Sequence, residues 1–186
     1  MEINSMDELN ITLAQWEEIY EFGGWEGEGS GPGSKLTHNL VLIDYLNDFI
    51  EQNSVSSLID LGCGDLQWMP HVFASYLEYV GVDFCKNVLD KNKANHPNQN
   101  FIHANFKDLT ESKELSFSKD VIHHDRDDMF KNFEKISELG SRYCMIVVPE
   151  YMKRRTTFET LVTAYDYVCV LDYVADETKS LYLKIK

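Results

Sequence analysis

The residues best suited to chemistry lie in one short stretch, SLIDLGCGDLQW, at residues 57–68. Asp60 lies near the end of an apolar run, and Gly62 and Gly64 follow it one residue apart. Glycines at this spacing allow a tight turn and let a ligand approach the main chain closely. The acids Asp60 and Asp65 on either side of the turn would repel a phosphate. They favour a ligand with a positive centre, such as an α-ammonium or a sulfonium group.

A second acid, Asp83, ends the apolar segment YVGVD at residues 79–83. A carboxylate at that place can accept hydrogen bonds from both hydroxyls of a ribose, which suits an adenosine-containing cofactor. A dinucleotide fingerprint needs a third glycine, but Gln67 occupies that position. Taken by itself, Asp83 is also a plausible N-cap for the helix that follows, and this interpretation stays open.

Short apolar segments alternate with helical patterns around these residues. Strands are expected at 57–61, 79–83, 100–104, 115–119 and 143–148, and helices at 7–22, 35–52, 66–77, 86–94, 128–139 and 157–164. Alternation of this kind predicts βαβ units and a parallel sheet. The runs 167–174 and 181–186, joined by a short polar turn, predict an antiparallel hairpin. The fold class is therefore α/β, a Rossmann-like and mostly parallel sheet with helices on both faces.

Composition limits the partners of the chain. With 186 residues it suits one domain, and its net charge of −14 disfavours a nucleic-acid partner. No apolar run has the length of a membrane span, and the N-terminus lacks a signal-peptide pattern, so we expect no membrane partner and a cytoplasmic location. The four cysteines have neither zinc nor CxxC spacing, which predicts no disulfide framework and no cysteine-based metal site. The oligomeric state is not predicted.

The pattern D-x-G-x-G of Asp60, Gly62 and Gly64, followed by the acid-ended segment 81–83, resembles the class I S-adenosylmethionine-dependent methyltransferases. The likeness runs from about residue 35 to the C-terminal hairpin. It implies that family's seven-stranded sheet, in which the last hairpin supplies one antiparallel strand. It also implies S-adenosylmethionine as the cofactor, whose sulfonium and ammonium groups match the acids of the first turn.

Three further motifs are similar to a subgroup of small bacterial and viral methyltransferases. They are SGPGS at 30–34, CGDLQWM at 63–69 and KDVIHH at 119–124. The subgroup pairs SGPGS with CGD-x-x-WM and with RDV-x-x-H. Lys119 stands where the subgroup usually has arginine, which puts a bidentate role at that position in doubt.

The resemblance implies a set of cofactor-binding residues: Asp60, Gly62, Gly64, Asp83, Phe84, Asn105, Phe106 and Ser34. The glycines would pass under the methionyl part, with Asp60 near its ammonium group, and Ser34 would touch its carboxylate. Phe84 would cover one face of the adenine, and Asn105 would read the adenine edge with Phe106 beside it. An asparagine after a strand is also a common turn residue, and SGPGS also fits a plain linker, so both interpretations stay open.

The candidate catalytic residues are His124, Asp120 and His123. If residues 120–124 form a helical turn, Asp120 and His124 share a face, and the carboxylate would orient the imidazole. The resemblance implies that this strand end faces the transferable methyl group, where a neutral histidine can take a proton from the nucleophile. Neighbouring helical side chains point about 100° apart, so the two histidines are poorly placed to share a metal ion, and none is predicted. A histidine satisfied by backbone groups is the plain alternative.

These observations predict a methyltransferase that acts on an oxygen or nitrogen nucleophile of a small molecule or a glycan, with a sugar hydroxyl as one case. One alternative is a catalytically inactive S-adenosylmethionine-binding regulator or scaffold. A second is a nicotinamide-dependent oxidoreductase with the same strand–turn–strand layout. Residues 1–34 are expected to form an N-terminal helix and a glycine-rich cover for the cofactor, and residues 35–186 the methyltransferase domain, within a single globular unit.

Overall fold

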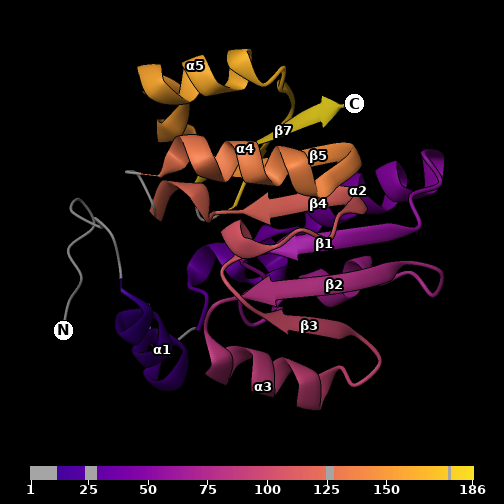
Figure 1. Cartoon of the computed structure of the whole chain (residues 1–186), viewed down its shortest axis with the longest axis vertical. Helices are drawn as coiled ribbons and strands as arrows, with labels where there is room; N and C mark the ends of the chain where they lie inside the picture. The colour runs from indigo at the N-terminus through magenta and orange to yellow at the C-terminus, as the bar shows by residue number, and fades with distance from the viewer. Residues whose placement is uncertain (1–11, 24–28, 125–127, 176) are drawn as a thin grey trace.

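The computed structural model describes residues 12–23, 29–124, 128–175 and 177–186. A seven-stranded sheet of order β3-β2-β1-β4-β5-β7-β6 lies at its centre (Figure 1). The strands are β1 (Ser57–Leu61), β2 (Glu78–Asp83), β3 (Asn100–His103), β4 (Lys113–Lys119), β5 (Gly140–Pro149), β6 (Val168–Val174) and β7 (Thr178–Ile185). β7 is antiparallel to both of its neighbours, and the other described pairs are parallel. The predicted α/β fold class with its C-terminal hairpin is confirmed.

Helices cover both faces of the sheet because strand residues alternate between two cores. Leu58 packs with Leu42 on one face, whereas Ile59 packs with Phe133 and Phe158 on the other. The helices are α1 (Leu13–Phe22), α2 (Leu40–Gln52), α3 (Lys86–Asn95), α4 (Met129–Leu139) and α5 (Thr156–Ala164). α2 belongs to the first core, and α4 and α5 belong to the second.

The carboxyl ends of β1 to β4 meet at one edge of the sheet, and α1 lies beside that edge (Figure 1). The register pairs Leu61 with Val82 and Asp83 with His103, so the loops after the first three strands are neighbours. In open α/β sheets this edge is where ligands bind. The fold therefore brings the glycine turn and Asp83 to the same place.

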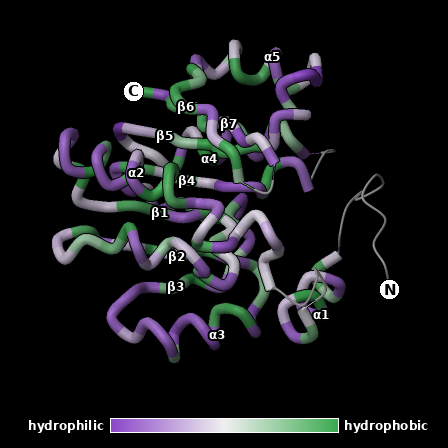
Figure 2. Tube along the Cα trace, turned by 180° about the vertical axis from the view of Figure 1, so that it is seen from behind, coloured by the Kyte–Doolittle hydropathy of each residue, from purple (hydrophilic) through white to green (hydrophobic). Residues whose placement is uncertain are grey.

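α1 is held at this edge by α3. Thr12 caps its start, since the Thr12 Oγ1 accepts from the Gln15 backbone N–H and the Gln15 side chain accepts from Thr12 N. Asn87 Nδ2 of α3 donates to the Glu17 carbonyl at 2.9 Å. The predicted helix over 7–22 is confirmed for its described part, and residues 7–11 lie outside the described residues. The α3 trace is largely hydrophilic, as expected for a helix that buries only a narrow stripe (Figure 2).

The helix predicted over 66–77 is wrong. Only a 3-10 turn, Met69–Val72, forms there. Leu66 has φ +57°, and Pro70 lies in the first turn, where its missing N–H is tolerated but cannot extend a longer helix. Trp68 and Met69 are nevertheless buried, so the apolar spacing reflected packing against the sheet and not helix formation.

Two other segments differ from expectation. The helix predicted from residue 35 begins at Leu40, after two short 3-10 turns. β4 is a central strand that starts two residues before the expected range 115–119. Its Ser116 and Ser118 are buried and satisfied, because their hydroxyls donate to the carbonyls of Ile136 and Leu61 at 2.6 and 3.1 Å. Hydroxyl groups bonded in this way let polar residues occupy a strand core.

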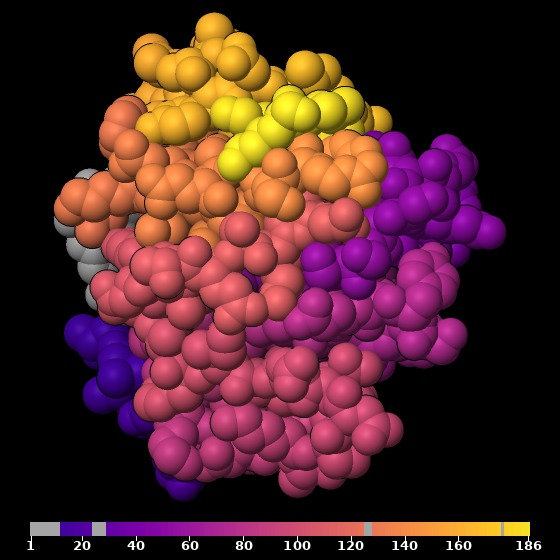
Figure 3. Space-filling model, turned by 45° about the vertical axis from the view of Figure 1, so that its right-hand side comes forward, coloured from indigo at the N-terminus to yellow at the C-terminus, as the bar shows by residue number. Residues whose placement is uncertain are grey.

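The C-terminal strands and α5 gather at one end of the molecule, and α3 and β3 gather at the other (Figure 3). β6 forms the outer edge of the sheet next to β7. Cys169 on this strand is exposed, whereas Cys144 on β5 is buried. All four cysteines are free.

Candidate functional site

The turn after β1 requires glycine at two positions. Gly62 and Gly64 have φ of +79° and +55°, a region that costs an L-residue about 1–2 kcal/mol. A Cβ on Gly62 would also lie 2.4 Å from Cγ2 of Val121, and a Cβ on Gly64 would lie 2.4 Å from the Ser30 Oγ. The turn therefore packs directly under the loop after β4 on one side and under the SGPGS segment on the other.

Asp83 fixes this turn to the end of β2. Its Oδ2 accepts from Gly64 N at 3.0 Å, and its Oδ1 accepts from Cys85 N at 2.9 Å. Burial raises the pKa of Asp83, and these backbone hydrogen bonds offset part of that rise. The carboxylate thus holds the backbone just before α3, but the N-cap of that helix is Cys85, so the N-cap interpretation of Asp83 is wrong. Each oxygen of Asp83 retains a lone pair for a ligand.

Asp60 lies below the turn in a nearly dry environment. Only 4% of the residue is exposed, and its Oδ2 accepts from the Tyr79 hydroxyl at 2.8 Å. Burial raises the pKa of Asp60 to about 7, against the lowering effect of the Tyr79 hydrogen bond. Asp60 can therefore change its charge near neutral pH.

The SGPGS segment is tied to the glycine turn by a reciprocal pair of hydrogen bonds. Ser30 N donates to the Asp65 Oδ2, and Asp65 N donates to the Ser30 Oγ, both at 3.1 Å. Gln67 Nε2 donates to the same Asp65 oxygen. Asp65 thus anchors segment 30–34 to the glycine turn, which corrects the expectation that Asp65 faces the positive centre of a ligand. Segment 30–34 is therefore not a free linker.

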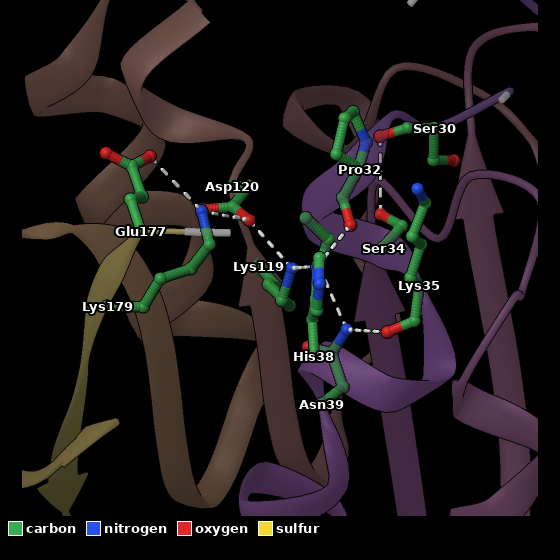
Figure 4. A network of polar contacts seen from close by, with 11 residues as sticks. Ser30, Pro32, Ser34, Lys35, His38, Asn39, Lys119, Asp120, Glu177 and Lys179 are labelled. Atoms are coloured by element: carbon green, nitrogen blue, oxygen red, sulfur yellow. Dashed lines mark hydrogen bonds and ion pairs between the residues drawn. The ribbon is translucent and has the colours of Figure 1, made fainter. Parts of the chain in front are cut away.

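A partly buried ion cluster at the end of β4 holds the other end of segment 30–34 (Figure 4). Lys119 Nζ donates to the Gly33 carbonyl at 3.0 Å and pairs with Asp120 at 2.7 Å. Lys179 of β7 pairs with the same carboxylate at 3.1 Å. Burial alone would raise the pKa of Asp120, but the Lys119 and Lys179 ammonium groups hold it below its usual value. A lysine at position 119 makes these contacts without the bidentate geometry of arginine.

These elements enclose a cavity of about 390 Å³, within the usual size range of small-molecule sites. Every cofactor-binding residue predicted from the sequence lines it: Asp60, Gly62, Gly64, Asp83, Phe84, Asn105, Phe106 and Ser34. The cavity is also lined by four residues that were not predicted from the sequence to belong to the site: Trp16, Tyr20, Lys107 and Asn132. For Asn132 a signal existed, because a polar residue three positions after Met129 and four before Ile136 falls on the apolar face of its helix.

The candidate catalytic residues separate in the structure. His124 and Asp120 line the cavity, and His123 does not. The helical turn expected over 120–124 is a shorter 3-10 turn over Ile122–His124, and Asp120 precedes it with φ +57°, so the expected i, i+4 pair does not form. Burial, with the neighbouring His124, lowers the pKa of His123 to about 3. His124 packs edge-on against the Trp16 ring at 5.2 Å.

Within the described residues, no group of three or more His, Cys, Asp or Glu side chains is placed to hold a metal ion. Among the helices of the described ranges, none is long and apolar enough to cross a membrane.

Comparisons with known proteins agree with this architecture. A family model described as "Methyltransferase domain" matches residues 59–142, a little under half of the chain. The structure is similar to magnesium protoporphyrin IX methyltransferase (ChlM) from Synechocystis PCC 6803 with bound SAM, with a TM-score of 0.66 and 9% identity over 81% of this chain and 80% of that one. No curated protein sequence matches significantly.

Two further solved structures share the fold. The N-methyltransferase NodS from Bradyrhizobium japonicum WM9, in complex with S-adenosyl-l-homocysteine, has a TM-score of 0.62 and 13% identity, and the match covers 78% of this chain and 86% of that one. The methyltransferase domain of bacterial CtHen1 has a TM-score of 0.66 and 14% identity, covering 80% of this chain and all of that domain. Residues 59–142 thus match a methyltransferase domain, and the seven-stranded sheet has the fold of solved methyltransferases that bind S-adenosylmethionine or S-adenosyl-l-homocysteine.

Proposed function

We propose that this chain is a methyltransferase that uses S-adenosylmethionine and transfers its methyl group to an oxygen or nitrogen nucleophile of a small molecule or a glycan. The observation that carries the proposal is one cavity that holds the glycine turn, the Asp83 carboxylate and His124 under an aromatic rim. The turn and the acid suit the methyl donor, while the histidine and the rim suit an uncharged acceptor. The proposal includes a sugar hydroxyl as the acceptor group.

For the donor, the proposed placement follows the chemistry of the cavity wall. The ribose hydroxyls bind the free lone pairs of Asp83, and Phe84, which is 36% exposed, covers one adenine face. Asn105 and Phe106 lie along the adenine edge. The methionyl part passes over Gly62 and Gly64 toward Asp60, whose negative charge offsets the ammonium group, and the methionyl carboxylate lies near Ser34. The donor supplies an electrophilic methyl group, and the residues of this chain position it for in-line attack.

For the acceptor, charge supports a neutral molecule. The cavity lysines are paired, Lys107 with Asp128 at 2.9 Å and Lys119 with Asp120 at 2.7 Å. With a net charge of −14, the protein offers little attraction to a polyanion. Trp16 lies edge-on to Phe84 at 6.5 Å and to His124 at 5.2 Å, which forms an aromatic rim. Apolar sugar faces pack well on such rings.

The base in this proposal is His124, which takes the proton of the nucleophile as the methyl group is transferred. Asp120 influences His124 only through its negative charge and not through a hydrogen bond, because the Asp120 oxygens are bound to Lys119 and Lys179. His123, which packs against His124 at a ring distance of 4.0 Å, serves to hold that ring in place. Its low pKa makes it a weak base.

The test measures S-adenosylhomocysteine release with a panel of hydroxyl and amine acceptors, including oligosaccharides, and with RNA as a comparison. We expect turnover with the neutral acceptors. His124→Asn should lower kcat by roughly 10²- to 10⁴-fold without a change in S-adenosylhomocysteine affinity. His71 is exposed and does not line the cavity, so His71→Asn is the matched control and should retain its turnover. Turnover with RNA alone would overturn the acceptor class, and donor binding without turnover on any acceptor would favour an inactive regulator.

A further inference from the structure

Asn132 of α4 is buried without any visible structural purpose. Only 1% of the residue is exposed, and it lines the cavity. Its Oδ1 has no hydrogen-bond partner, and its Nδ2 makes no hydrogen bond to a described residue. Burial of an unpaired amide destabilises a fold, so such a group calls for an explanation.

The other fully buried asparagines behave differently. Asn92 Nδ2 donates to the Gly64 carbonyl at 2.7 Å. Asn39 Nδ2 donates to the carbonyls of Gly33 and Lys35 at 2.9 and 2.8 Å. Both side chains therefore support the backbone around the cavity through Nδ2, although the Asn39 Oδ1, like that of Asn132, has no hydrogen-bond partner among the described residues. Asn132 has no such role, which points to a ligand as its partner.

The position of Asn132 indicates which part of the ligand it meets. α4 is bound to the segment after β3 at two points. Lys107 Nζ pairs with Asp128, just before the helix, at 2.9 Å, and Lys135 Nζ of the helix donates to the Leu109 carbonyl at 3.1 Å. Phe106 of that segment lines the same cavity as Asn132. Asn132 thus lies on the side where the proposed function places the adenine edge.

Asn105, the residue expected to bind the adenine edge, already makes a hydrogen bond within the protein. The Asn105 Oδ1 accepts from Lys107 N at 3.0 Å, where it caps a 3-10 turn, and Asn105 is an exposed residue. An exposed amide that is already capping a turn discriminates weakly, because water competes for its remaining groups. The adenine amino group therefore needs a second, dry acceptor.

We propose that Asn132 recognises the adenine of the bound cofactor through both ends of its amide. Oδ1 accepts from the N6 amino group, and Nδ2 donates to N7, which is the pairing that asparagine makes with the adenine edge in nucleic-acid recognition. Both unpaired ends of the amide are satisfied in this way. The inference rests on the proposed placement of the nucleoside.

The experiment replaces the amide by an apolar group of similar size and measures two properties. Asn132→Leu should weaken S-adenosylhomocysteine binding in calorimetry by roughly 5- to 100-fold. The same change should raise the melting temperature of the ligand-free protein, because an unpaired buried amide is removed. A residue with a purely structural role would not move these two readouts in opposite directions.

Ser137 on the same helix provides a matched control. Its hydroxyl is buried and lies 3.1 Å from the Tyr167 hydroxyl, and neither residue lines the cavity. Ser137→Ala should lower the melting temperature and leave the affinity for S-adenosylhomocysteine unchanged. Asn132→Ala, which only removes atoms, serves in the same assays if leucine does not fit.

An analogue of S-adenosylhomocysteine with carbon in place of N7 tests the contact itself. The wild type should bind this analogue more weakly than S-adenosylhomocysteine, and Asn132→Leu should show no further loss. Equal S-adenosylhomocysteine affinity of wild type and Asn132→Leu, or an additive loss with the analogue, would overturn the role of Asn132. If the wild type binds S-adenosylhomocysteine normally but the amide change has no effect, only this inference fails. If the wild type does not bind S-adenosylhomocysteine, the proposed function fails first.

Discussion

Asp60→Asn isolates the free energy of burying a charge under the glycine turn. Asparagine has nearly the same shape, and its amide oxygen still accepts from the Tyr79 hydroxyl that now bonds the carboxylate at 2.8 Å. The substitution therefore removes the titration of Asp60 and little else. Any difference in pH dependence between the two proteins reports the buried carboxyl group.

The magnitude follows from the shifted pKa. Burial raises the pKa of Asp60 from 3.8 to about 7, and each unit corresponds to about 1.4 kcal/mol. Because the folded-state pKa lies above the unfolded value, the folded protein holds the extra proton. The wild type therefore loses about 4 kcal/mol relative to Asp60→Asn as pH rises from below 4 to above 7. More than half of this loss falls between pH 5 and 8.

The assay is urea unfolding of both proteins at several pH values from 5 to 8. The stability difference should grow in favour of Asp60→Asn and level off above pH 7. The difference between the two unfolding free energies at each pH cancels the pH dependence of groups that do not interact with residue 60. Asp83 is not one of these groups, because its charge contributes to the raised pKa of Asp60. Stability curves that run parallel across this range would refute the claim that Asp60 is desolvated and titrates near neutral pH.

Two further predictions concern the turn and the cluster behind it. Gly62→Ala should destabilise the protein by at least about 1–2 kcal/mol from its left-handed backbone, with an added clash against Val121. Adding Val121→Ala to this variant should restore the stability lost to the clash but not the stability lost to the left-handed backbone. A urea midpoint of Gly62→Ala equal to that of the wild type would contradict this geometry. Asp120→Asn should cost about 3 kcal/mol at neutral pH, because it leaves two buried lysines without their shared anion. As the pKa of Asp120 lies below its usual value, the wild type should lose this advantage as pH falls below 4, and a pH-independent difference would argue against the ion pairs.

Local patterns were sufficient to predict most of the sheet. β1 was predicted at its observed bounds, Ser57–Leu61, because a short apolar run that ends at a glycine turn is typical of a buried strand. The helix over 66–77 was wrong because the same apolar spacing can arise from a loop whose side chains pack on the sheet. The predicted division at residue 34 stays a prediction.

For the site, too, the sequence predicted some features and the tertiary structure set the others. The sequence by itself determined the residue types at the strand ends, Asp60, Gly62, Gly64 and Asp83, since a turn with left-handed backbone and a buried acid restricts the choice of residue. Only the tertiary structure decided which groups those acids meet. It committed Asp65 to the covering loop and Asp120 to two lysines, and it left the amide of Asn132 unpaired. Hydrogen-bond partners of this kind come from segments far apart in the chain, and no local pattern of residues encodes them.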